Sequence, residues 1–404
     1  LDLSPVIFSI EQAPADGADG GFEDDNHVGP QSHYHNIGAS FQRDPRSADW
    51  GVFGSLKIVL FKSRLNLLIP CGFLAILINY INHNHGWVFP LSLLGIIPLA
   101  ERLGFTTEQL GLYTGRTAGG LLNATFGNAT ELVISIHALR SGKLRVVQQS
   151  LLGSILSNTL LVLGCAFFGG GLACGKTEQA FRKEDAVLNS GLLLMAVMGL
   201  VSPAMLYYTH TEVNLGQSAL ALSRFSSCIM LVAYAAFIYF ELSNSRRRDE
   251  ASEASMMSSF SSTHYLFIPL QVSEGASKAW EIPIAFISTV LLPIVGNAAE
   301  HASAVMFAMK DKLDISLGVA IGSSTQISMF VIPFSVVTGW MMGQPMDLNF
   351  HLFETASLLI TVLVVAFLLQ DGTSNCFKGL MLILCYLIVA ASFYVYADPN
   401  IDDG

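Results

Sequence analysis

Two carboxylates lie inside strongly apolar stretches of this 404-residue chain, each within the same short pattern. Glu131 ends the sequence Gly-Asn-Ala-Thr-Glu, and Glu300 ends Gly-Asn-Ala-Ala-Glu. A charged side chain at the centre of a membrane helix costs about 2.5–3.5 kcal/mol, so such residues usually have a function. Carboxylate, amide and backbone oxygens are the ligands that calcium prefers, and the motifs therefore predict a site for a hard cation. The expected ligands are Gly127, Asn128, Glu131, Gly296, Asn297 and Glu300, with the glycines opening the helix to free backbone oxygens.

The two motifs belong to an internal repeat. Asn297 follows Asn128, and Ser323 follows Ser154, at one constant offset (297 − 128 = 323 − 154 = 169). A Lys-Leu pair between them recurs at this spacing too, so two helices and their connecting turn align without a gap. Transporters are commonly built from such repeats, with the substrate bound where interrupted helices meet. The alternative, polar residues that only bond one helix to another, explains a duplicated motif less well.

The helices after the motifs add hydroxyl and amide groups that could line the same site. These accessory groups are Ser154, Ser157, Asn158, Ser323 and Gln326. Individually they suit hydrogen bonds between helices as well as contact with an ion. Ser157 aligns with Gln326, so the site is expected to be only approximately symmetric.

Four residues suit proton coupling. Glu131 and Glu300 can exchange a cation for protons, and His301 follows Glu300 directly in a position where Leu132 stands in the first motif. Histidine titrates near physiological pH, although a histidine simply hydrogen-bonded within the bundle is the alternative. Glu101 either relays protons or forms an interfacial ion pair with the adjacent arginine.

Composition restricts the class of protein. Apolar residues make up 52% of the chain and charged residues only 13%, and the mean hydropathy is +0.52. These values predict an all-α polytopic membrane protein in contact with the lipid bilayer. The net charge of −10 without a basic stripe argues against a nucleic-acid partner. The six cysteines form no CxxC pair and suggest packing residues, and no enzyme motif such as GxSxG or HExxH is present.

The apolar runs predict about ten clear spans. They lie at about 66–82, 87–103, 117–140, 146–169, 187–208, 218–241, 281–309, 315–340, 351–369 and 377–396. The expected organisation is a disordered polar tail at 1–56, a leading transmembrane helix at 57–86, a first exchanger repeat at 87–241, a cytosolic linker at 242–280, a second repeat at 281–397 and a short acidic tail at 398–404.

Charge bias predicts the orientation. Five Lys and Arg residues between Arg43 and Arg64 place the N-terminus in the cytosol, because positive loops stay on that side. Alternating from there puts most other basic loops in the cytosol as well. Arg140, Lys143 and Arg145 are the exception, since they fall on the far side.

The chain resembles the calcium/proton exchangers of the cation/calcium exchanger superfamily, in the vacuolar type known from plants, fungi and protists. The resemblance rests on five stretches: Pro98 through Arg102, Gly119 through Glu131, Ser150 through Asn158, Gly296 through His301, and Met346 through Phe350. The Glu-His ending of the second motif is similar to this branch and not to the sodium/calcium branch, which speaks against a sodium- or potassium-coupled exchanger.

The resemblance implies a leading helix followed by two inverted five-helix repeats, and alternating access to a central site. In such exchangers the motif glutamates, here Glu131 and Glu300, bind the ion with help from backbone oxygens around Gly127 and Gly296. Calcium, with other divalent cations, would enter an acidic compartment such as the vacuole in exchange for protons, without cofactor or ATP. The sequence leaves the oligomeric state open, a homo-oligomer included.

One region departs from that family. Members carry a full helix before the Glu-Gly-Ala-Ser stretch at 274–277, whereas this chain has only a weak apolar run at 265–272, so that an eleventh span near 265–280 is weak or missing. Counting clear spans then makes the two motif helices parallel, and inverted repeats need them antiparallel. A truncated or non-transporting regulatory paralogue of a full-length exchanger is therefore the alternative function.

Overall fold

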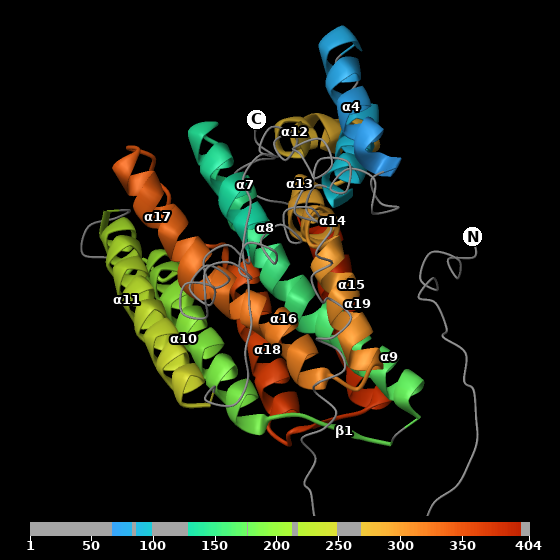
Figure 1. Cartoon of the computed structure of the whole chain (residues 1–404). Coiled ribbons are helices and arrows are strands. Elements are labelled where there is room, and N and C mark those ends of the chain that lie inside the picture. The colour runs from blue at the N-terminus through green and yellow to red at the C-terminus, as the bar shows by residue number, and fades with distance from the viewer. Residues whose placement is uncertain are drawn as a thin grey trace, which may run out of the picture. The chain divides into compact units, whose positions relative to one another are not determined.

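The computed structural model describes residues 67–82, 86–98, 128–175, 177–211, 217–248 and 268–396. All of them belong to one compact unit, Val59–Gly404, and nearly all are helical (Figure 1). Glu101, Gly127 and both predicted tails lie outside the described residues.

The elements follow one another in two series. The first series comprises α4 (Ile69–Asn82), an unlabelled helix Gly86–Pro98, α7 (Ala129–Arg140), α8 (Leu144–Leu156), the π-helical segment η4 (Ser157–Val162), α9 (Leu163–Cys174), β1 (Gln179–Ala180), α10 (Lys183–Tyr208) and α11 (Gln217–Arg248). The second comprises α12 (Ile268–Trp280), α13 (Ile284–Phe286), η7 (Ile287–Leu291), α14 (Leu292–Gly296), α15 (Ala298–Met309), α16 (Leu313–Gln326), η8 (Ile327–Val331), α17 (Ile332–Met341), α18 (Leu352–Leu369), β2 (Thr373–Ser374) and α19 (Cys376–Val395).

Six helical stretches in the described residues are long and apolar enough to cross a membrane. They are Leu144–Cys174, Lys183–Tyr208, Gln217–Glu241, Leu313–Met341, Leu352–Leu369 and Cys376–Val395. The pair Ile284–Gly296 and Glu300–Met309, bent by 59°, would form a seventh span. The all-α membrane architecture is thus confirmed, whereas the ten-span count is not, because α4 and the helix Gly86–Pro98 are shorter and part of the predicted third span lies outside the described residues.

The predicted linker at 242–280 is helical at both ends. Helix α11 continues to Arg248, well past the predicted end at 241. Helix α12 begins inside the weak apolar run and continues through the Glu-Gly-Ala-Ser stretch to Trp280. Its 13 residues reach only about 20 Å, which is shorter than the hydrocarbon layer. Trp280 packs edge-on against Phe89, so α12 is anchored on the helix Gly86–Pro98.

The internal repeat extends further in the structure than in the sequence motifs. Helices α7, α8 and α10 begin at residues 129, 144 and 183, and α15, α16 and α18 begin at 298, 313 and 352. Each later helix thus starts at the same offset from its counterpart as the motifs do (298 − 129 = 313 − 144 = 352 − 183 = 169). Segments η4 and η8 occupy nearly equivalent positions as well, with starts at 157 and 327. Three helices and a π-helical segment of each half therefore correspond.

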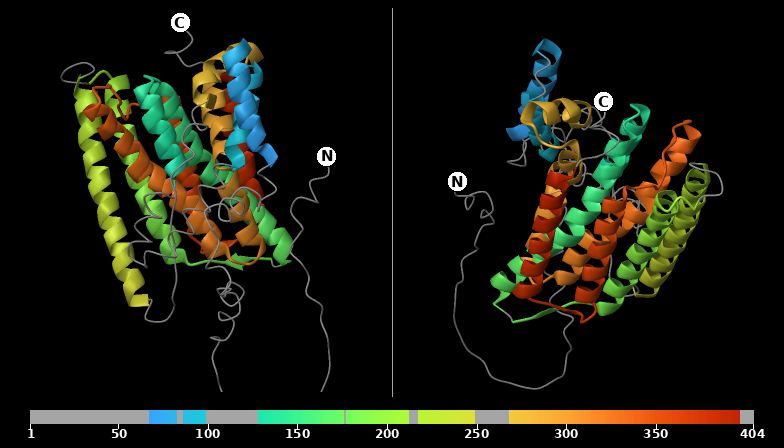
Figure 2. Two further views of the ribbon diagram at one scale, coloured as in Figure 1. Left: turned by 45° about the horizontal axis from the view of Figure 1, so that its top comes forward. Right: turned by 180° about the vertical axis from the view of Figure 1, so that it is seen from behind.

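The two motif helices run in opposite directions. Helices α7 and α8 are antiparallel because they are joined by the short turn Ser141–Lys143. Helix α15 is parallel to α8–η4–α9, because Asn297 contacts Ser154, His301 contacts Asn158, and Ala308 lies against Gly170. It follows that α7 and α15 are antiparallel, as Figures 1 and 2 also show. The parallel arrangement inferred from counting spans is therefore wrong.

Burial separates central helices from peripheral ones. The continuous helix α8–η4–α9 is the most buried of the spans and packs against α15, α16 and α19, while α11 and α19 keep exposed apolar side chains such as Val232 and Ile388. An exposed apolar face is the expected surface toward lipid. At one end of the bundle β1 and β2 pair antiparallel, so the α9–α10 connection is hydrogen-bonded to the α18–α19 connection. All six cysteines are free, as the sequence predicted.

The contact between α8 and η7 requires a glycine. A Cβ at Gly153 would overlap the backbone carbonyl of Thr289 and crowd the Pro293 ring. We predict that Gly153→Ala lowers the thermal unfolding midpoint of the purified protein, since overpacking typically costs about 1–3 kcal/mol. Gly191→Ala is the matched control, because that Cβ meets nothing within 4 Å on an exposed helical surface. Equal midpoints for the two variants would contradict the close approach of α8 and η7.

Candidate functional site

The two motif asparagines mark the starts of α7 and α15. Asn128 and Asn297 are the N-cap residues, with φ of −107° and −104°, and neither side chain caps its own helix. Their amides are therefore free to bond elsewhere. Asn128 Nδ2 donates to Gln326 Oε1 over 2.7 Å, and Asn297 Nδ2 donates to Ser154 Oγ over 3.3 Å. Each motif thus bonds to the opposite half of the repeat.

Two equivalent serines connect the motifs. Ser154 lies beside both Glu131 and Asn297. Ser323 donates from Oγ to Glu300 Oε2 over 3.4 Å, and its carbonyl accepts from Asn128 Nδ2 over 3.4 Å. Each serine therefore contacts the glutamate of its own half and the asparagine of the other. This reciprocal pattern brings both motifs to one site.

The site contains buried oxygens without partners. Glu131 is 5% exposed, and neither of its carboxylate oxygens has a hydrogen-bond partner of ordinary geometry among the described residues. Asn128 Oδ1 is likewise buried and unpartnered in this part of the chain. The contacts of Ser154 and Ser323 bring Glu131 and Glu300 into the same polar cluster. Buried oxygens with this need for compensation fit a bound cation.

The donor set is one of oxygens. Among the described residues, no group of three or more His, Cys, Asp or Glu side chains is arranged to hold a metal ion. The oxygens at the site belong instead to two carboxylates, two amides and serine hydroxyls. Such a set suits a hard cation that is bound and released, because it lacks the soft ligands of a tight transition-metal site.

Helical irregularities surround this site. The bend between α14 and α15 falls at Gly296 and Asn297, and η4, η7 and η8 interrupt the three helices packed around it. π-helical turns leave backbone carbonyls less regularly paired and often occur at functional sites. The second motif thus bends its helix, whereas the freeing of backbone oxygens at Gly296 stays a prediction and Gly127 lies outside the described residues.

The accessory residues divide into two groups. Asn158 Oδ1 bonds to His301 Nε2 over 3.0 Å, and Gln326 bonds to Asn128, so both belong to the polar network of the site. Ser157 does not, because its hydroxyl donates to the Ser154 carbonyl of its own helix. His301 thus sits within the bundle with a defined partner, and its role in proton transfer stays a prediction.

Two further hydroxyls were not identified from the sequence. Ser288 and Thr289 in η7 are buried, and neither hydroxyl has a partner among the described residues. They lie on the segment that packs against α8 next to Gly153. The repeat could not have revealed them, since glycines occupy the equivalent positions 119 and 120.

Comparison with known proteins decides the family. The sodium/calcium exchanger protein family matches residues 84–243 and 266–395. The chain belongs to this family. The exchanger is 61% identical to vacuolar cation/proton exchanger 5 of Arabidopsis thaliana, with 91% of this chain and 89% of that protein covered. It is 62% identical to vacuolar cation/proton exchanger 3 of Oryza sativa subsp. japonica, with 86% of this chain and 90% of that protein covered. It is therefore a secondary transporter of the cation/proton exchanger type.

Solved structures agree with this assignment. The exchanger is 35% identical to native YfkE, with a TM-score of 0.70 over 82% of this chain and 100% of that one. A second structure of YfkE is described as that of a Ca2+/H+ antiporter protein. The H+/Ca2+ exchanger CAX shares the fold at 13% identity, with a TM-score of 0.60 over 86% of this chain and 90% of that one.

The alignments with the relatives contain positions that this exchanger does not fill. The alignment with the Arabidopsis protein runs over 394 positions, of which this chain fills about 368 (91% of 404), leaving about 26 unmatched. The Oryza alignment runs over 374 positions, of which the chain fills about 347 (86% of 404), leaving about 27.

We predict different effects for two serines one helical turn apart. Ser154→Ala removes a hydroxyl that lies beside both Glu131 and Asn297, so the apparent affinity for the transported cation should fall several-fold. Ser157→Ala removes only a bond within α8–η4 and should leave that affinity unchanged. Concentration dependence of cation uptake in vesicles measures both. A loss of affinity in Ser157→Ala alone would show that the site is assigned to the wrong face of α8.

Proposed function

We propose that this exchanger moves calcium across a membrane in exchange for protons at the site formed by Glu131 and Glu300. The observation that carries the proposal is the reciprocal contact of Ser154 and Ser323, because it joins the two motifs in one buried cluster. The metal ligands would be Asn128, Glu131, Asn297 and Glu300, with backbone oxygens near Gly127 and Gly296. The similarity to YfkE, a Ca2+/H+ antiporter, supports calcium as the cargo.

The exchange of calcium for protons follows from the free-energy cost of burying two charged carboxylates close together. Two charged carboxylates in a low-dielectric site repel each other, and either one divalent cation or bound protons relieve that repulsion. Calcium and protons therefore exclude each other. An acidic compartment supplies the protons that displace calcium, so a proton gradient can drive calcium into that compartment.

Alternating access would use two inverted five-helix repeats behind a leading helix. The antiparallel motif helices and the constant offset between equivalent helix starts support this arrangement. His301, held by Asn158, is well placed for proton transfer to or from the neighbouring Glu300. Glu101 is a further proposed relay.

The names of the relatives support a vacuolar membrane as the location. In the orientation that the charge bias predicts, the N-terminus faces the cytosol. The α15–α16 turn, with Lys310 and Lys312, then faces the cytosol as well. The α7–α8 turn then faces the acidic side. Other divalent cations would use the same oxygen ligands.

We predict that calcium enters acid-interior vesicles only while the proton gradient persists. Glu131→Gln and Glu300→Gln should each abolish gradient-driven uptake, since one remaining carboxylate cannot balance a divalent cation. Uptake of labelled calcium, with a pH dye inside the vesicles, measures the exchange.

The control is Glu184→Gln, a carboxylate exposed at the start of α10, which should leave uptake unchanged. A protonophore should collapse uptake in the wild type. Uptake that persists with the protonophore, or in both motif variants, would refute proton-driven transport at this site.

The short helix α12 favours a second candidate function, a regulatory paralogue that pairs with a full-length exchanger. Its 13 residues are too few to span the hydrocarbon layer, and the chain leaves about 26 of the 394 positions in the Arabidopsis alignment unfilled. We predict that inserting an apolar helix of about 20 residues, long enough to span, before Glu274 abolishes uptake if the present chain transports, because one added span would make the antiparallel motif helices parallel. Folded wild type without uptake, rescued by the insertion, would establish the regulatory alternative.

A further inference from the structure

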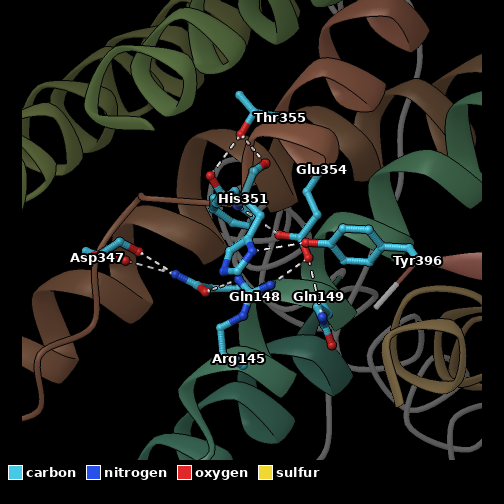
Figure 3. A network of polar contacts seen from close by, with 9 residues as sticks. Arg145, Gln148, Gln149, Asp347, His351, Glu354, Thr355 and Tyr396 are labelled. Atoms are coloured by element: carbon cyan, nitrogen blue, oxygen red, sulfur yellow. Dashed lines mark hydrogen bonds and ion pairs between the residues drawn. The ribbon is translucent and has the colours of Figure 1, made fainter. Parts of the chain in front are cut away.

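A polar network joins α8 to the loop before α18 and to the first turn of α18 (Figure 3). Arg145, in the first turn of α8, donates to Glu354 Oε1 over 2.7 Å, and Gln149 donates to the same oxygen over 3.3 Å. Glu354 is fully buried and Arg145 is 16% exposed. Gln148 adds a 2.9 Å bond to Asp347. The network therefore ties the first motif half to the second.

This ion pair is costly to build and costly to break. Burying two charges removes them from water, so the pair adds little net stability, yet removal of one partner leaves an unbalanced buried charge. Its place on α8 suggests what it serves, since Ser154 lies nine residues further along the same helix, about 14 Å away. Any movement of the start of α8 is transmitted to the cation site through a rigid helix.

A second tie occupies the equivalent positions of the repeat. Asp314 is the counterpart of Arg145, and Arg182 and Asp185 are the counterparts of His351 and Glu354, all at the same offset as the motifs. The Arg182 backbone N–H donates to Asp314 Oδ1 over 2.7 Å, and the side chains approach to 3.9 Å. Arg182 also pairs with Asp185 at 2.7 Å. Helix α16 is thereby tied to the start of α10, as α8 is tied to the start of α18.

The two ties lie at opposite ends of the bundle and differ in tightness. Because α15 runs parallel to α8–η4–α9, α16 starts beside the end of α9, where Gln179 also bonds to Asp311. The tie there is open to solvent, with Arg182 60% and Asp314 46% exposed. The tie at the α7–α8 end is buried. The two ties join equivalent helices through different residue pairs. A difference in burial between them is what internal inverted symmetry produces when one end of the molecule is closed and the other is open.

We infer that Arg145 with Glu354 and Asp314 with Arg182 are positioning residues that form two alternating latches. When the α8–α18 latch forms, that end of the exchanger closes and the α16–α10 latch loosens. When the α16–α10 latch forms, its own end closes and the α8–α18 latch loosens. The inference rests on the alternating access proposed above, but not on calcium as the cargo. Each latch acts through its helix on the serine beside the carboxylates.

Matched cysteine reporters test the inference. Thr355 and Ala186 are equivalent, buried residues that directly follow Glu354 and Asp185. Thr355→Cys and Ala186→Cys are each introduced into a chain whose six native cysteines are replaced, and purified protein is labelled with a water-soluble maleimide. The double variant Arg145→Gln with Glu354→Gln removes the α8–α18 latch. It should raise the labelling rate of Cys at position 355 several-fold and lower the rate at position 186. Asp314→Asn should do the reverse.

The reciprocal change is the decisive result. Size-exclusion profiles should confirm that each variant is folded. Faster labelling at both positions, or at the mutated end alone, would overturn the inference, since local loosening explains it. Because labelling needs no transport, reciprocal rates in a protein without calcium uptake would refute the proposed cargo and leave the latches standing.

Discussion

The burial of two carboxylates among apolar helices is the constraint on which this structure depends. Glu131 and Glu300 belong to one polar cluster, and the Glu131 oxygens are buried without a hydrogen-bond partner among the described residues. Such a pair is tolerable only when cations or protons occupy the site. The reciprocal contacts of Ser154 and Ser323 then hold the carboxylates together from two antiparallel helices.

The same symmetry organises the remainder of the bundle. Helix starts recur at one offset through three helices, and π-helical segments interrupt the central helices around the site. Close contact at Gly153 shows that the two halves are tightly packed where α8 meets η7. Contacts at the two ends of the bundle, far from the two carboxylates, are suited to select between conformations.

Charge at the membrane surface also has a structural explanation. Arg145 belongs to the one loop that conflicts with the positive-inside pattern, and in the folded protein its charge is balanced by the buried Glu354. The loop stays an exception to the charge bias, because that bias counts Lys and Arg residues without regard to acidic partners.

The sequence by itself determined the membrane class, the duplicated motif and the candidate site residues Glu131, Glu300, Asn128 and Asn297. It could do so because hydrophobic length and a charge inside an apolar run are local properties. Only the tertiary structure decided that the motif helices are antiparallel, since counting spans fails when one helix is short. It also decided that Ser154 touches both motifs whereas Ser157 bonds to its own helix, and that Arg145 pairs with Glu354. Those outcomes depend on which helices meet across the bundle, and no local pattern encodes a contact between residues so far apart in the chain.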